Sequence, residues 1–255
     1  MRNRVNVGGV LFDNVNMSEA VFVMEKKIKE YNGRGTELLC VANQDSIRRI
    51  PEVDGLDHNE INQSFLIIPD GFSIVVASKL LGSPLKERVT GPDLMKKFIE
   101  ISANKGYKNF FLGAKDGIAF KMVNLFKDKY PSLKVAGIYS PPFGEFSKDE
   151  NEKIINMINE SKADILWVSF GCPKQEKWII ENKDKINVPI SAGVGAAFDF
   201  HSGNKKRAPL FMQKIGLEWF YRFLQEPLRM WNRYFVGGIK FISIILKQKK
   251  EQKQS

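Results

Sequence analysis

The chain has 255 residues, 43% of them hydrophobic, and this is enough to build a substantial core, which excludes an intrinsically disordered chain. Its formal charge of +10 indicates an anionic partner, and nucleic acid, phospholipid and a phosphorylated substrate all fit that charge. The two cysteines, Cys40 and Cys172, are too few for a disulfide framework. Their number is typical of a reducing compartment, where both would be free thiols.

The N-terminal segment begins Met-Arg-Asn-Arg and lacks the apolar core of a signal peptide, so we expect a cytoplasmic protein. The longest apolar stretch, Phe235–Leu246, contains Lys240. It is shorter than the ~18 apolar residues that indicate a membrane span. We therefore expect that any contact with a membrane is peripheral, on its inner face.

Short apolar runs alternate with segments of helical periodicity over residues 1–200, and this is the pattern of an α/β protein. The runs are apolar throughout, as in strands that are covered on both faces, which favours a mostly parallel, Rossmann-like sheet flanked by helices. Strands are predicted at 38–42, 65–68, 109–112, 134–138, 165–170 and 190–192. Helices are predicted at 17–31, 72–81, 92–104, 117–129, 148–161 and 175–182, with a capping box formed by Ser147 and Glu150.

Strand patterns stop after residue 200, and the chain changes character there. Residues 201–255 contain 12 Lys or Arg against 3 Glu, so they carry +9 of the formal charge, together with nine of the 29 aromatic residues. We predict two or three amphipathic helices, one of them opened by Pro227. The sequence thus divides into a catalytic α/β domain, 1–200, and a basic, aromatic-rich helical appendage, 201–255. We expect the appendage to dock on an anionic membrane and to complete the active site.

Ligands of open parallel sheets bind beyond the carboxyl ends of the strands, so the loops that follow the predicted strands are candidate sites. Asp70 follows one strand and precedes a helix, where its carboxylate would project into such a crevice. A capping or turn aspartate is the alternative. At Gly113, backbone N–H groups before a helix would hold a diphosphate, or the segment is a plain tight turn.

A dense group of polar side chains follows the strand at 165–170, and it includes Gln175. Its alternative is a solvated helix start. Cys172 lies in the same loop, but the sequence places neither histidine beside it, which disfavours a cysteine nucleophile.

The segment from Gly193 through Gly195 to Asp199 begins like a dinucleotide fingerprint, but Phe198 stands where a third small residue is expected. The pattern is a weak indication of NAD, while Gly193 and Gly195 still allow the close approach of a nucleotide. Metal binding is disfavoured because the histidines and cysteines have no ligand spacing and an Asp-x-Asp pair is absent. We expect no cofactor and no metal.

A bound nucleotide diphosphate would then need arginines and backbone amides to balance its charge. The appendage offers Arg222, Arg229 and Arg233, which would share one face if a single helix continued through them. Pro227 argues against that continuity. A solvated basic face is the alternative.

Six motifs, taken together and in this order, resemble the WecG/TagA/CpsF glycosyltransferase family along nearly the whole chain. They are Pro69-Asp70-Gly71, Glu87-Arg88-Val89-Thr90-Gly91, the segment from Gly171 to Trp178 with Pro173-Lys-Gln-Glu-Lys inside it, Gly193-Val-Gly-Ala-Ala-Phe-Asp199, Lys206-Arg-Ala-Pro209, and the segment from Gly216 to Arg222 that contains Glu218-Trp219.

This resemblance implies an inverting enzyme. Members of the family move a sugar, often N-acetylmannosamine or its uronic acid, from a UDP donor to an undecaprenyl-diphosphate-linked sugar during synthesis of teichoic acid or other surface polysaccharides. It also implies that Asp70 is the catalytic base and that Asn43, Arg88 and Gln175 are polar residues of the pocket. The arginines of the appendage would engage the donor diphosphate. Val41-Ala42 stands where the family often has Thr-Pro, and the loss of a hydroxyl can shift sugar specificity.

Two other functions fit parts of the sequence. A nucleic-acid-binding protein would use the basic appendage, but the large apolar residues within it, such as Ile239 and Phe241, suit a bilayer or a protein groove better. A nicotinamide-dependent oxidoreductase would use the incomplete fingerprint. We expect a UDP-sugar and a polyprenyl-diphosphate acceptor as partners, no nucleic acid, and a homo-oligomer as one possible assembly.

Overall fold

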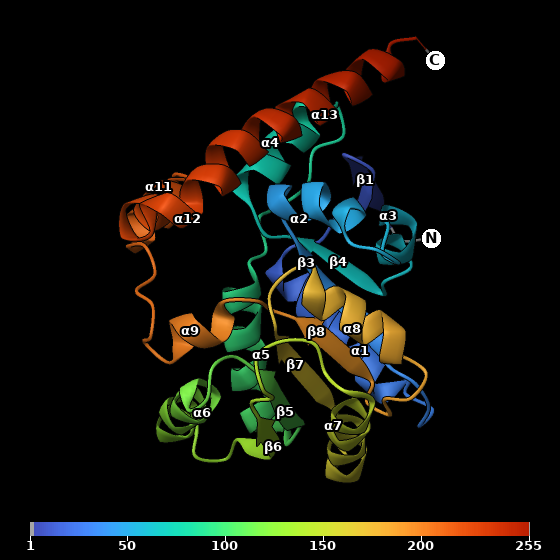
Figure 1. Cartoon of the computed structure of the whole chain (residues 1–255), viewed down its shortest axis with the longest axis vertical. Coiled ribbons are helices and arrows are strands. Elements are labelled where there is room, and N and C mark those ends of the chain that lie inside the picture. The colour runs from blue at the N-terminus through green and yellow to red at the C-terminus, as the bar shows by residue number, and fades with distance from the viewer. Residues whose placement is uncertain (1–2, 255) are drawn as a thin grey trace.

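Six parallel strands form the central sheet of the protein (Figure 1). The computed structural model describes residues 3–254, apart from the side chain of Arg229. The strands lie in the order β4-β3-β8-β7-β5-β6, and every neighbouring pair is parallel. Their bounds are Glu37–Ala42 for β3, Leu66–Pro69 for β4, Lys108–Gly113 for β5, Lys134–Tyr139 for β6, Ile165–Ser169 for β7 and Ile190–Gly193 for β8. The predicted parallel α/β fold is confirmed, and each predicted strand is present.

Helices cover both faces of this sheet, because alternate residues of each strand point to opposite sides. In β3, Leu38 and Cys40 belong to one buried core cluster, whereas Leu39 and Val41 belong to the other. The first cluster includes side chains of α2 (Gln44–Arg49), α3 (His58–Asn62), α4 (Phe72–Leu80), α7 (Lys148–Ser161) and α8 (Lys174–Asn182). The second includes side chains of α1 (Met17–Lys29), α5 (Gly91–Lys105), α6 (Ile118–Lys129) and α9 (Ala197–His201).

All six predicted helices of the α/β domain are present, with ends within two residues of the predicted ones. Helices α2, α3 and α9 and the short 3₁₀ turn η1 (Ile50–Glu52) were not predicted. The expected capping box of α7 is half formed. Ser147 caps the helix by accepting from the backbone N–H of Glu150, but the carboxylate of Glu150 accepts from the hydroxyl of Tyr139 instead of returning to Ser147.

An N-terminal hairpin, β1 (Arg4–Val7) and β2 (Val10–Asp13), packs beside β4 and was also not predicted. Its turn residues Gly8 and Gly9 have φ of +64° and +91°, a left-handed conformation that glycine adopts without strain. Asp13 anchors the hairpin, since its buried carboxylate accepts from Ile67 N at 2.8 Å and from Arg4 Nε at 3.1 Å.

The appendage consists of helices, as predicted, and Pro227 opens one of them. They are α10 (Leu210–Lys214), α11 (Glu218–Gln225), α12 (Pro227–Trp231), the π-helical turn η2 (Asn232–Val236) and α13 (Gly237–Gln252). The expected boundary at residue 200 lies inside α9. Within residues 3–254, no helix has the length and apolar character needed to cross a bilayer.

Helix α13 returns to the α/β domain and packs against α2 and the N-terminal hairpin (Figure 1). Its buried side chains Phe241 and Ile245 belong to the same core cluster as the sheet. The backbone N–H of Gly8 donates to the side chain of Gln248 at 2.8 Å. The end of the appendage is therefore part of the fold of the domain that it covers.

A substitution at the buried pair Asn109 and Trp167 tests the packing of the sheet core. Trp167 Nε1 donates to Asn109 Oδ1 at 2.9 Å, and both side chains are fully buried. We expect Asn109→Leu to lower the free energy of unfolding by about 1–3 kcal/mol, because it leaves the indole N–H without a partner. Urea denaturation measures this. Replacement of the exposed Asn32 by Leu is the control, which we expect to cost less than about 0.5 kcal/mol; equal stability of N109L and the parent would contradict the assignment.

Candidate active site

The loops singled out in the sequence meet at the carboxyl edge of the sheet. Asp70 follows β4, Asn43 follows the adjacent β3, and Gly193 ends β8 on the other side of β3. Gln175 lies in the first turn of α8, which follows β7, and Gly113 ends β5. Parallel strands bring these positions to one side of the sheet even though they are far apart in the chain, and this is the side where ligands bind.

The backbone around Asp70 is held on both sides. Asp70 N donates to Ala42 O at 2.9 Å, and Pro69 O accepts from Val89 N at 3.1 Å. The following helix has Gly71 as its N-cap and no side-chain capping bond, so Asp70 is not a helix cap. The local structure leaves its carboxylate free of a capping role.

The carboxylate of Asp70 is partly buried and surrounded by charged groups. The pKa of Asp70 is raised to about 7. Burial is the largest cause of this rise, and the nearby carboxylate of Glu218 contributes to it. Three guanidinium groups lower it, namely those of Arg88, Arg222 and Arg207. A carboxyl group whose pKa lies near neutrality can take up a proton and release it at physiological pH, as a general base must.

Glu218 of α11 connects the appendage to this carboxyl edge. Its carboxylate lies between two guanidinium groups, with Arg88 Nη1 at 3.3 Å and Arg207 Nε at 3.3 Å. Arg207 also donates to Asp93 at 2.6 and 2.9 Å and to Thr90 Oγ1 at 3.2 Å, at the start of α5. The side chains of Arg88, Arg207 and Glu218 are each exposed by less than 20%, so this network is protected from solvent.

Gln175 ties two glycine loops together. Its Oε1 accepts from Gly171 N and from Gly195 N, both at 3.1 Å, and its Nε2 donates to Glu176 Oε1 at 2.8 Å. The side chain lies against Gly193, where an added Cβ would come within 2.8 Å of Gln175 Nε2. Only 2% of Gln175 is exposed. The structure therefore places Gln175 behind the surface of the site, where it supports the loops after β7 and β8.

Glu176 is completely buried next to this amide. Burial is the first cause of its raised pKa of about 7, and the hydrogen bond from Gln175 opposes the shift. Burial also raises the pKa of the thiols of Cys40 and Cys172 well above the usual range. A thiol with a raised pKa is a poor nucleophile, which argues further against Cys172 in that role.

Asn43 and Gly113 have clear structural tasks. Asn43 caps α2 by accepting from Asp45 N at 2.9 Å and from Ser46 N at 3.3 Å. Gly113 has φ of +106°, and an added Cβ would lie 2.7 Å from Ser169 O, so no other residue fits between β5 and β7 there. Asn43 also lies next to Gly71, whose added Cβ would be 3.5 Å from the Asn43 Cβ.

The arginines of the appendage lie on three separate elements. Arg222 of α11 is near Asp70 and stacks over the Phe200 ring at 5.5 Å. Arg233 of η2 forms an ion pair with Asp45, with Nε and Oδ2 3.4 Å apart. The side chain of Arg229 lies outside the part of the structure that is described. Helix α11 ends before Pro227, so these arginines do not share one helical face.

Sequence reasoning gave no role to Glu218, Arg207 or Glu176. Each lies inside a motif that was singled out, but only the fold shows which partners it has. Within residues 3–254, no three His, Cys, Asp or Glu side chains are grouped closely enough to hold a metal ion.

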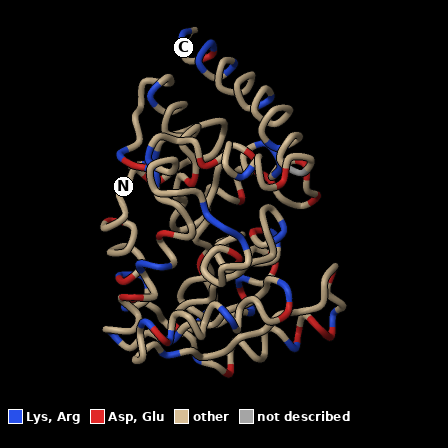
Figure 2. Tube along the Cα trace, turned by 90° about the vertical axis from the view of Figure 1, so that its left-hand side faces the viewer, with Lys and Arg blue, Asp and Glu red and all other residues tan. Residues whose placement is uncertain are grey.

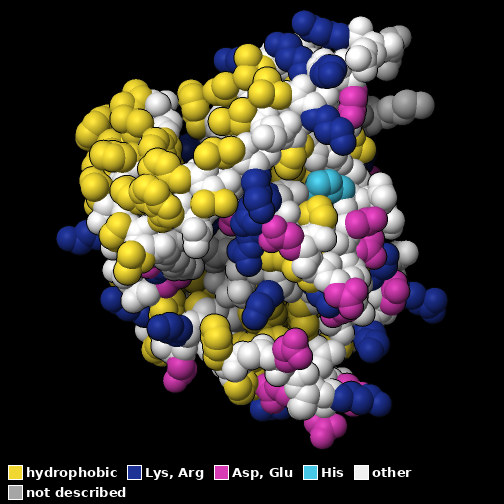
Figure 3. All heavy atoms as spheres, turned by 45° about the horizontal axis from the view of Figure 1, so that its top comes forward, with side chains coloured by type: hydrophobic (Ala, Val, Ile, Leu, Met, Phe, Trp, Pro, Cys, Tyr) yellow, Lys and Arg dark blue, Asp and Glu magenta, His cyan; other side chains and the backbone are white. Residues whose placement is uncertain are grey.

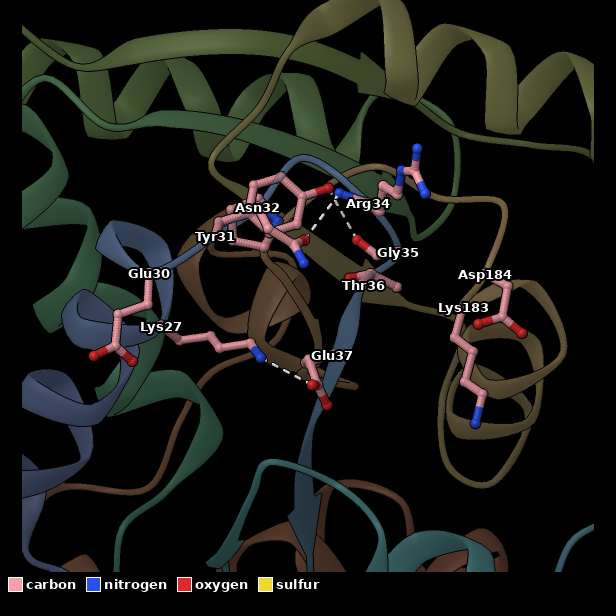
Figure 4. Close-up of a pocket in the computed structure, with 11 residues that line it drawn as sticks. Lys27, Glu30, Tyr31, Asn32, Arg34, Gly35, Thr36, Glu37, Lys183 and Asp184 are labelled. Atoms are coloured by element: carbon pink, nitrogen blue, oxygen red, sulfur yellow. Dashed lines mark hydrogen bonds and ion pairs between the residues drawn. The ribbon is translucent and has the colours of Figure 1, made fainter.

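A hollow lies at the opposite, amino edge of the sheet (Figure 4). It has a volume of about 350 Å³ and is lined by the end of α1, the start of β3 and the segment after α8. Lys27 pairs with Glu37 at 2.8 Å there, and the Tyr31 hydroxyl donates to Gly35 O at 3.0 Å. None of the predicted site residues lines this hollow, so it is separate from the carboxyl-edge site.

Comparison with known proteins gives consistent results. The family model described as "Glycosyl transferase WecG/TagA/CpsF family" matches residues 5–255. A Bacillus subtilis (strain 168) protein named N-acetylglucosaminyldiphosphoundecaprenol N-acetyl-beta-D-mannosaminyltransferase is 33% identical over 193 residues, which cover 76% of this chain and 73% of the relative. A Staphylococcus aureus (strain MW2) protein of the same name is 30% identical over 245 residues, 95% of this chain and 91% of the relative. The chain therefore belongs to the WecG/TagA/CpsF family of glycosyl transferases.

Proposed function

We propose that this glycosyltransferase moves N-acetylmannosamine, or a closely related sugar, from a UDP donor to a polyprenyl-diphosphate-linked N-acetylglucosamine. The names of the relatives describe such a mannosaminyltransferase and such an acceptor. The observation that carries the proposal is Asp70, a partly buried carboxyl group with a pKa of about 7 among three arginines at the carboxyl edge of the sheet. A nicotinamide or nucleic-acid function has no comparable support.

In the proposed reaction, Asp70 is the general base. Its carboxylate takes the proton of the acceptor hydroxyl while the hydroxyl oxygen forms a bond to the anomeric carbon of the donor sugar. The bond from that carbon to the diphosphate breaks on the opposite side, and its electron pair leaves with UDP. A single displacement of this kind inverts the anomeric configuration.

The leaving diphosphate needs positive charge in the same site, across the donor sugar from Asp70. Arg222 supports this role because it is near enough to lower the pKa of Asp70. Arg88 and Arg207 also lower the pKa of Asp70, although both are paired with Glu218. We assign the donor diphosphate to Arg222 and Arg233, together with Arg229, and we propose that the arginines and backbone amides balance its charge without a metal.

The surface of the appendage supports a position on a membrane. Leu228 is 92% exposed, Ile239 68% and Ile242 58%, and Figure 3 shows hydrophobic side chains gathered over this part of the molecule. Lysines continue along α13 to the chain end (Figure 2). An exposed apolar patch with adjacent basic residues suits an anionic bilayer, and we propose that the enzyme docks there on the inner face of the plasma membrane.

Replacement of Asp70 tests the proposed base directly. We expect Asp70→Asn to lower kcat by about 10²–10⁴-fold, because an amide cannot accept the proton, while the affinity for UDP changes little. Product formation from a panel of UDP-sugars and a short-chain lipid-diphosphate N-acetylglucosamine is followed by mass spectrometry. Calorimetry with UDP is the control for binding. Turnover near that of the parent enzyme would remove Asp70 from the role.

The raised pKa of Asp70 gives a pH dependence. The base acts in its ionised form, so kcat/KM should fall as pH drops below about 7, by up to tenfold per pH unit. Glu218 raises this pKa, and Glu218→Gln should move the midpoint of the profile to lower pH. Measurement of kcat/KM between pH 5 and 9 for the parent and for E218Q gives both midpoints. An unchanged midpoint in E218Q would show that Glu218 does not act on Asp70.

Membrane docking is tested by polar substitutions in the appendage. We expect the triple variant L228S/I239S/I242S to bind phosphatidylglycerol-containing vesicles at least about tenfold more weakly, because each substitution removes apolar area from the contact. The double variant F22S/F120S is the matched control, since both side chains are exposed and lie on α1 and α6. Vesicle cosedimentation measures both variants, and equal weakening of both would contradict docking through the appendage.

A further inference from the structure

The carboxyl group of Glu176 is an unexpected feature of the floor of the site. The residue is fully buried, its Oε1 accepts from Gln175, and its Oε2 has no hydrogen-bond partner among the described residues. A buried polar atom without a partner loses its hydration and gains nothing in return, which destabilises the fold. An apolar side chain of similar size would avoid this cost, so the carboxyl group needs an explanation beyond packing.

The hydrogen bond between Gln175 and Glu176 bears on how the amide of Gln175 is oriented. The side-chain amide has an oxygen that accepts and a nitrogen that donates, and the two are nearly equal in size. Glu176 Oε1 accepts from Gln175 Nε2 at 2.8 Å, so Gln175 Oε1 faces the opposite way. That direction is where Gly171 N and Gly195 N donate, both at 3.1 Å.

The two glycines are placed to meet a ligand. Gly171 and Gly195 have φ of +84° and +53°, and a Cβ added to either would have nothing within 4 Å. Their outer sides therefore face open space at the carboxyl edge, while their N–H groups point inward to Gln175. If Gln175 turned its amide by half a rotation, its NH₂ would face both N–H groups and the two loops would be driven apart.

We propose that Glu176 is a positioning residue for sugar transfer: by holding the amide of Gln175 in one orientation, it keeps the glycine loops after β7 and β8 at the spacing that the substrate requires. The inference about substrate rests on the proposed function. The inference about the loops does not, because it concerns only the hydrogen bonds of Gln175.

The neutral and ionised forms of Glu176 both leave Oε1 as an acceptor. Groups that face the carboxyl are the thiols of Cys40 from β3 and Cys172 from the β7 loop, the amide of Gln175, and the guanidinium of Arg49 from α2. The Arg49 guanidinium also donates to Cys172 O at 3.1 Å. A glutamine at 176 would present the same acceptor without a charge, so it is the conservative variant.

Amide hydrogen exchange at Gly171 and Gly195 tests the positioning role without any assay of activity. We expect both amides to exchange at least about tenfold faster in Glu176→Met than in the parent, and at the parent rate in Glu176→Gln. Asn109→Leu is the control for lost stability, because it perturbs the far end of β5 and should leave both amides protected. Equal protection in E176M and the parent would overturn the proposal.

Kinetics test whether the loop spacing serves the reaction. We expect E176M to raise the KM for the UDP-sugar about tenfold, with a smaller change in kcat. Both constants of E176Q should stay within about threefold of the parent values. The folded fraction of N109L should keep the parental KM and kcat. The double variant Q175M/E176M should be no worse than Q175M alone, because Glu176 acts through Gln175. Additive losses, or parental constants in E176M, would overturn the role in catalysis. If the parent protein transfers no sugar, the proposed function fails, and the exchange experiment still decides the role of Glu176.

Discussion

The ion pairs of Glu218 are the interaction on which the rest of this site depends. One carboxylate from the appendage binds Arg88, in the segment between α4 and α5, and Arg207, which is itself fixed to the start of α5. Opposite charges that are both protected from water attract each other more strongly than exposed pairs do, and removal of one partner is costly because the other charge is left unpaired. The same negative charge makes ionisation of Asp70 harder. Attachment of the appendage and tuning of the carboxyl group at residue 70 are therefore one electrostatic arrangement.

A second layer of support lies beneath the surface of the site. Gln175 uses its side-chain oxygen to hold two loops, and Glu176 holds Gln175. Residues that would contact a substrate thus rest on buried polar groups, which is how proteins fix a site to within fractions of an ångström. This also explains why Gln175, for which the family resemblance implies a place in the pocket, is nearly inaccessible to solvent.

The fold was predictable from sequence, because strands that are apolar throughout indicate a covered parallel sheet. The meeting of the candidate loops was predictable too, because such a sheet gathers the loops after its strands at one edge. The partners of the polar residues were not predictable. Arg88 and Glu218 are 130 residues apart, and nothing in either segment indicates the other. The N-terminal hairpin was missed although Gly8-Gly9 between alternating apolar residues is a hairpin signal. A helix at 44–49 was missed because it is only six residues long, and its cap, Asn43, was considered only as a pocket residue.

The contact between Gly8 and Gln248 joins residues that are 240 positions apart. All six strands of the sheet are synthesised by residue 193, whereas Glu218 and α13 are synthesised after them. Because folding during synthesis proceeds from the N-terminus, the sheet can form while the chain is still growing. The residues that complete the charged network and the apolar surface of the appendage are made only after the whole sheet. A nascent chain whose sheet has already folded consequently still lacks both the carboxylate of Glu218 beside Asp70 and the apolar surface of the appendage.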